Sequence, residues 1–174
     1  MSDHDSPVIR AAAVIYSKNT KAEFVFSNFA KEMKTQGLSV GGLVQEFLYD
    51  DEGNRTGLDA IEVDTGARIP INRPTESDKT NGVCSLDRSA LTESTSALRR
   101  AIANRVDLIV VEKFGEQEQK GSGLADEILA AMAEGIPTLV LVPQSALEQW
   151  NTFSGGMADE ITCSPEAVRD WWNT

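Results

Sequence analysis

The chain has 174 residues, of which 41% are hydrophobic, and its formal net charge is −11 at pH 7. The length suits one domain with one sizeable core, and the negative charge argues against binding to nucleic acid or acidic lipid, because both are polyanions. The sequence contains no apolar run near the roughly 20 residues that cross a bilayer, so we expect a cytoplasmic protein outside the membrane.

Cysteine and histidine are scarce, which limits the chemistry that the chain can support. Cys84 and Cys163 lie far apart without a metal-binding spacing, and the one histidine, His4, lies in a polar amino terminus. Catalysis by a histidine base or at a histidine-ligated metal is therefore disfavoured, and the thiols suit a reducing compartment. Cys84 precedes a predicted helix, which leaves two interpretations: a redox or soft-metal role and, favoured here, a structural thiol.

A short polar terminus precedes a single predicted α/β domain. We expect residues 1–7 to be disordered and residues 8–174 to form the domain. In chain order, its first half predicts a strand at Val8–Ile15, a helix from Ala22 to Gly37, a strand at Leu38–Gln45, and short strands at Leu58–Asp64 and Ala67–Ile71. Polar turns join the last two strands, so the pattern predicts an antiparallel β-ribbon at the edge of the sheet.

The second half returns to alternating helices and strands after a polar stretch, Asn72–Gly82, that we expect to be a mobile loop. Its predicted elements are a helix from Asp87, a strand within Val106–Gly115, a helix from Leu124, a strand at Pro137–Pro143, a helix at Ser145–Phe153, a strand at Asp159–Cys163 and a helix from Ser164. Asp87 and Ser164 suit helix N-caps. Ser154–Gly156 either lets backbone approach a ligand or ends a helix, and both interpretations stay open.

The stretch Val106–Gly115 is the centre of the predicted sheet. Its Val- and Ile-rich run is typical of a parallel strand that is buried on both faces. Open α/β sheets bind ligands at the carboxyl ends of their strands. Glu112 and Lys113 follow this strand directly, so we expect them to lie at such a site. The turn at 121–123 can direct backbone N–H groups at an anion. The alternative is that Glu112 is solvated and the glycines only make the turn.

Several short motifs together resemble the bacterial family called domain of unknown function 2478. They are Gly41–Gln45, Asp64–Gly66, Val83–Asp87, Phe114–Glu118, Gly121–Leu124, Gly135–Pro137, and Trp150 with Phe153–Gly156. No single piece is specific, but the combination covers nearly the whole chain. The resemblance implies no established activity, although members of that family look associated with molybdenum transport genes.

A more distant resemblance links residues 8–142 to small P-loop nucleoside-triphosphatases. It implies a three-layer P-loop-NTPase-like α/β fold, with a mainly parallel central sheet and an antiparallel β-ribbon at one edge. It also implies that Glu112 holds magnesium, whereas Lys113 replaces the acid that positions the attacking water; Glu118 is the nearby substitute. A lysine is protonated at neutral pH and cannot accept the proton of that water. The first loop, Tyr16–Lys21, lacks the glycines and the Lys-Thr pair that grip phosphates.

Three hypotheses about function follow. The first is a binding protein for a small anionic ligand, either a nucleotide, a phosphate or a tetrahedral oxyanion such as molybdate, without efficient hydrolysis. Its predicted ligand-binding residues are Lys18, Asn19, Thr20, Lys21, Lys113, Gly121, Ser122 and Gly123. The second is a slow NTPase that uses magnesium with the nucleotide, with Glu112 on the metal and Glu118 as the catalytic residue. The third is an interaction or regulatory subunit, in which Trp171 and Trp172 pack in the core or in a homo-oligomer rather than stack on bases.

Overall fold

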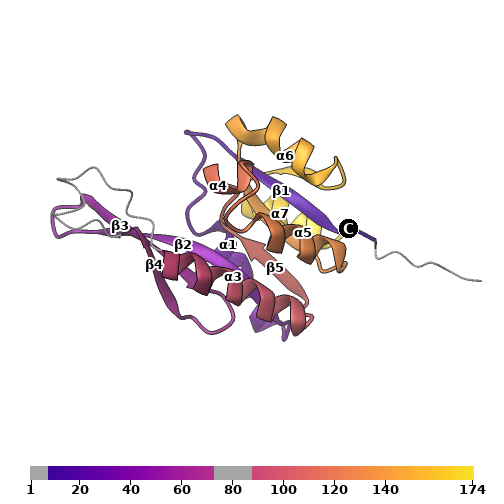
Figure 1. The fold of residues 1–174 in the computed structure, drawn as a ribbon, viewed down its shortest axis with the longest axis horizontal. Helices are drawn as coiled ribbons and strands as arrows, with labels where there is room; N and C mark the ends of the chain where they lie inside the picture. The colour runs from indigo at the N-terminus through magenta and orange to yellow at the C-terminus, as the bar shows by residue number, and fades with distance from the viewer. Residues whose placement is uncertain (1–7, 73–87) are drawn as a thin grey trace, which may run out of the picture.

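A mixed seven-stranded sheet forms the middle layer of the computed structural model, which describes residues 8–72 and 88–174 (Figure 1). The strands are β1 (Ala11–Tyr16), β2 (Val40–Tyr49), β3 (Arg55–Glu62), β4 (Arg68–Asn72), β5 (Leu108–Val111), β6 (Thr138–Pro143) and β7 (Asp159–Thr162). Their spatial order is β4-β3-β2-β5-β6-β1-β7. The strands from β2 to β7 in this order run parallel, and β3 and β4 extend the sheet as an antiparallel ribbon.

Helices cover both faces of the sheet and make the fold a three-layer structure. They are α1 (Val25–Thr35), α3 (Arg88–Ala103), α4 (Glu116–Gln119), α5 (Ala125–Ala133), α6 (Leu147–Ser154) and α7 (Pro165–Trp172), with a 3₁₀ turn at Gln144–Ala146. In Figure 1, α3, α5 and α6 lie in front of the sheet, whereas α1 and α7 lie behind it. The predicted α/β fold is therefore confirmed, including its parallel centre and the ribbon at one edge.

Alternating side chains of β5 divide the hydrophobic core into two halves. Ile109 and Val111 pack with α3, α5 and Trp150 on one face, whereas Leu108 and Val110 pack with α1 and α7 on the other. All four β5 residues are fully buried. An apolar side chain of this size contributes roughly 1.5–3 kcal/mol when it is removed from water, so β5 anchors both layers.

Several elements differ in extent from the sequence predictions. Helix α1 begins at Val25 instead of Ala22, because the preceding residues form turns and Phe24 has a left-handed backbone (φ 67°). Strand β2 runs on to Tyr49, since its second half pairs with β3. Helix α4 was not predicted, because its four residues are too polar to show an apolar stripe.

Other predictions concern helix ends and the part of the chain that is not described. Ser164 caps α7 as predicted, because its Oγ accepts the backbone N–H of Ala167 at 3.1 Å. The predictions for residues 1–7, Cys84 and Asp87, and for the loop beyond Asn72, lie outside the described residues. Within the described ranges, none of the helices combines the length and the apolar character that a membrane crossing requires.

Two ion pairs hold α3 against its neighbours. Arg100 donates to the nearly buried carboxylate of Glu62 on β3 at 2.7 Å, and Arg99 donates to Glu127 on α5 at 3.1 Å. A buried carboxylate that loses its partner is costly, so these contacts fix the position of α3 over the ribbon and over α5.

Gly42 brings β2 close to β5. A Cβ atom at this position would lie 1.9 Å from the carbonyl oxygen of Val110, and the backbone has φ +109°. We expect Gly42→Ala to lower the free energy of unfolding by more than about 3 kcal/mol, because the clash with a buried strand adds to the backbone strain. Urea denaturation measures this change.

Gly53→Ala is the matched control for that substitution. Gly53 also has a positive φ, +85°, but a Cβ atom there meets no other atom within 4 Å. Its substitution should cost only about 1 kcal/mol, from backbone strain alone. Equal losses in the two variants would contradict the proposed role of close strand packing.

Candidate functional site

The carboxyl ends of the parallel strands share one edge of the sheet, and most of the predicted site residues lie there. Strand β6 lies between β1 and β5, and Val140 of β6 is level with Ala13 on one side and Val111 on the other. The first loop, which follows β1, and Glu112, which follows β5, are therefore on the same edge but two strands apart. This is the position at which open α/β sheets bind ligands.

Glu118 braces the turn that follows β5. Its Oε1 accepts the backbone N–H of Gly115 at 2.9 Å, and its Oε2 accepts the backbone N–H of Leu124 at 2.9 Å. A Cβ atom at Gly123 would lie 1.9 Å from Oε2, so the brace requires a residue without a side chain at this position. The carboxylate thus joins the end of β5 to the start of α5. The catalytic role of Glu118 stays a prediction. To act on a water molecule, its carboxylate would have to do so while it accepts these two hydrogen bonds.

A hollow of about 140 Å³, here called the β5 hollow, opens beside this brace. Its polar lining residues are Gln45, Ser94, Glu112, Lys113, Gln117 and Glu118. Its other lining residues are Leu43, Ala60, Ile71, Ala90, Leu91, Gly123 and Leu124. The walls therefore come from β2, the ribbon, α3 and the α4–α5 turn.

Glu112 is the titratable group of the β5 hollow whose environment is most unusual. Burial raises the pKa of its carboxyl to about 7, although the backbone N–H of Gln45, which donates to Oε2 at 3.2 Å, and the charge of Lys113 both lower it. The negative charge of Glu23, which lies between the first loop and α1, raises this pKa further. At neutral pH the carboxyl is thus partly protonated, which weakens it as a ligand for a divalent cation.

Magnesium at Glu112 stays a prediction. Among the residues of the described ranges, no three His, Cys, Asp or Glu side chains come together in a group that could hold a metal ion. Glu112 would therefore supply one carboxylate, and a bound nucleotide and water would have to supply the other oxygen ligands, as is common for magnesium. Cys163 adds no reactive ligand, because burial and the charge of Glu112 raise the pKa of its thiol to about 11.

A second, more open hollow lies where the first loop meets the end of β6. This β1 hollow has a volume of about 470 Å³ and is lined by Tyr16, Ser17, Lys18, Pro143, Gln144 and Ser145. The first loop is closed on itself, because the hydroxyl of Thr20 accepts the backbone N–H of Ser17 at 3.0 Å. The loop therefore exposes Lys18 beside the hollow instead of wrapping around an anion.

The structure distributes the predicted ligand-binding residues over several places. Lys113 and Gly123 line the β5 hollow with Glu112 and Glu118, whereas Lys18 lines the β1 hollow. Thr20 lines an adjoining hollow beside β7, and Gly121 lines one beside α6. Asn19, Lys21 and Ser122 are exposed. The roles of all eight residues stay predictions. Only some of them share a hollow with Glu112, so the eight do not form one continuous pocket.

Sequence reasoning missed several residues that line the two hollows. Gln144 and Ser145 directly follow the predicted strand that became β6, so the rule for carboxyl ends was a usable signal. Ser94 has the spacing of the apolar residues of α3, and nothing local indicates that it faces a hollow. Gln45 ends the predicted strand at Leu38–Gln45, so the rule for carboxyl ends was a usable signal for it too, although in the structure it lies in the middle of β2.

The sheet order defines an α/β protein with a mainly parallel sheet and an antiparallel edge, and its P-loop-like character follows from its similarity to an ATP-binding protein. The chain belongs to the family described as protein of unknown function (DUF2478), which matches residues 11–171. It is also 37% identical over 163 residues to the molybdenum import ATP-binding protein ModC 2 of Bradyrhizobium diazoefficiens. This similarity covers 94% of the chain but only 18% of that longer protein. No solved structure matches the chain.

The raised pKa of Glu112 predicts a pH-dependent stability. The folded state binds a proton more tightly than the unfolded chain, so stability falls as the pH rises from about 4.5 to about 7. We expect Glu112→Gln to remove this fall and to raise the free energy of unfolding at pH 8 by roughly 1–3 kcal/mol. Urea denaturation at pH 5 and pH 8 measures the difference, and an unchanged pH dependence in the variant would refute the assignment.

Proposed function

We propose that this protein binds a phosphate-bearing ligand or a tetrahedral oxyanion at the β1 hollow and does not hydrolyse it efficiently. The observation that carries this proposal is the charge of the lining. Among the six lining residues, Lys18 is the one charged side chain, and hydroxyl and amide groups supply the other donors. In a chain with a net charge of −11, a concave surface without carboxylates is where an anion meets the least repulsion.

The start of α1 supports an anion at this edge. This eleven-residue helix follows the first loop, and no side chain caps its first turn. The backbone N–H of Val25 donates to the carbonyl of Ala22 at 3.3 Å, and the positive end of the helix dipole favours a negative charge nearby. Lys18 precedes this helix in the same loop and adds a mobile positive charge.

The size of the β1 hollow and the name of the relative both bear on the ligand. A volume of about 470 Å³ lies within the usual range of small-molecule sites, so the hollow admits a nucleotide as well as a smaller oxyanion. The similar protein is named for molybdenum import and for ATP binding, which are the same two ligand classes. ATP and molybdate are therefore the first ligands to test.

Two features of the edge disfavour rapid hydrolysis. Lys113 lies beside Glu112, where a P-loop enzyme would need a second acid, and Glu112 itself is partly protonated at neutral pH. Both oxygens of Glu118 already accept backbone N–H groups. A general base needs an available lone pair that faces the water, so we assign this chain to binding and not to turnover.

Thermal unfolding in the presence of separate ligands tests this proposal. We expect ATP, GTP, phosphate, sulfate or molybdate, each with and without magnesium, to include at least one ligand that raises the melting temperature. Lys18→Ala should weaken that ligand's binding about tenfold or more, because a charge-assisted hydrogen bond is lost. Lys31→Ala, which removes an exposed lysine from the middle of α1, is the control and should leave binding unchanged.

A phosphate-release assay separates binding from the alternative of a slow NTPase. We expect no magnesium-dependent release of phosphate from ATP or GTP above the rate of the protein-free buffer. Release that Glu118→Gln abolishes would overturn the proposal in favour of an NTPase. A protein that none of these ligands stabilises would instead be an interaction or regulatory subunit, whose edge hollows serve no anion.

A further inference from the structure

We propose that the β5 hollow is a second site, and that it binds a small zwitterion with a compact apolar body, of the class of the aliphatic α-amino acids. The site is distinct from the β1 hollow, since the two hollows share no lining residue. The inference therefore does not depend on the anion that the β1 hollow binds.

The walls of the β5 hollow favour a ligand with an apolar part. Aliphatic side chains line it from four directions: Leu43 from β2, Ala60 and Ile71 from the ribbon, Ala90 and Leu91 from α3, and Leu124 from the start of α5. An inorganic oxyanion would lose hydration against these apolar walls. An aliphatic group would gain by leaving water.

Charges of both signs meet at the polar side of the same hollow. Lys113 supplies an ammonium group and Glu112 a carboxyl group, while the carboxylate of Glu118, whose two oxygens accept backbone N–H groups, adds negative charge beside them. A simple anion would face both carboxyl groups, and a simple cation would face the lysine. A molecule that carries an ammonium and a carboxylate on adjacent atoms finds an opposite partner for each of its charges, which is the arrangement that electrostatic complementarity favours.

Uncharged donors in the hollow also lack partners. Ser94 is only 6% exposed and lines the hollow, yet its hydroxyl makes no hydrogen bond within the described part of the chain. The side-chain amides of Gln45 and Gln117 line the same hollow and are likewise without a hydrogen-bond partner among the described residues. Ser94 is buried, Gln45 is half-buried and Gln117 is exposed, so these three groups can form hydrogen bonds with a polar ligand that enters the hollow.

The size of the hollow limits the ligand to a few heavy atoms. Its volume is about 140 Å³, and a cavity of roughly 150 Å³ holds one benzene molecule. Nucleotides require sites of about 300 Å³ or more. Valine combines both charges with a branched three-carbon group and is the first ligand to test.

A series of related ligands tests the proposal on the unmodified protein. L-Valine at millimolar concentrations should raise the melting temperature by about 2–4 °C. Isobutyrate and isobutylamine, which each keep only one charge, should bind at least tenfold more weakly by calorimetry, and glycine, which lacks the apolar group, should also bind more weakly. If isobutyrate or isobutylamine binds as tightly as L-valine, the zwitterion assignment is wrong.

Two lysine variants locate the binding. Lys113→Met keeps the length of the side chain and should lose most of the L-valine affinity, whereas Lys120→Met, outside the β5 hollow, should keep it. Binding of molybdate or phosphate that Lys113→Met abolishes, without any binding of L-valine, would overturn the inference and assign an inorganic anion to this hollow. Lys18→Ala changes only the β1 hollow. A loss of anion binding in that variant therefore tests the proposed function, whereas the L-valine experiments test the β5 hollow separately.

Discussion

The burial of β5 on both faces is the constraint on which the rest of the structure depends. Its four apolar residues require a helical layer on each side, and the neighbouring strands must approach it closely enough to complete the backbone hydrogen bonds. Gly42 makes that approach possible on the β2 side. The first polar residues after β5 then emerge at the carboxyl edge, so the core itself places Glu112 and Lys113 in the candidate site.

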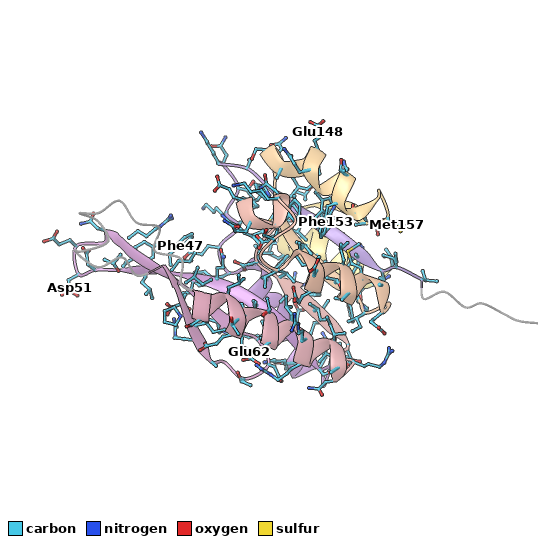
Figure 2. The ribbon with its side chains drawn as sticks, viewed as in Figure 1. Phe47, Asp51, Glu62, Glu148, Phe153 and Met157 are labelled. Carbon is cyan, nitrogen blue, oxygen red and sulfur yellow. The ribbon has the colours of Figure 1, made fainter. Side chains whose placement is uncertain are left out.

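The fold was largely predictable because its strongest signals are local. The apolar run of β5, the turn chemistry of the ribbon and the Ser164 cap each predict an element that the structure contains. The wrong element boundaries occur where contacts between distant parts of the chain determine the length of an element. Strand β2 extends through its pairing with β3, in which Phe47, labelled in Figure 2, is opposite Leu58, and no signal within β2 itself marks that extension.

The candidate site was less predictable because it depends on which side chains meet across the sheet. The sequence indicated Lys18, Glu112 and Lys113 from their positions after strands, but it could not show that β6 separates the first loop from β5. Ser94 is the clearest example of a missed residue. Its place on the helix has the spacing of a core position, and only the packing of α3 against the ribbon shows that it borders a hollow.

The brace between Glu118 and the α4–α5 turn has a consequence for how sequences of this family can diverge. The carboxylate fills the space that any side chain at Gly123 would occupy, so neither position can change freely while the other stays as it is. A relative that lacks the carboxylate of Glu118 no longer requires glycine at position 123. A relative with a larger residue at position 123 requires a shorter side chain at position 118. The two positions are therefore expected to drift as a pair, and members that lack both would have rebuilt this turn by other means.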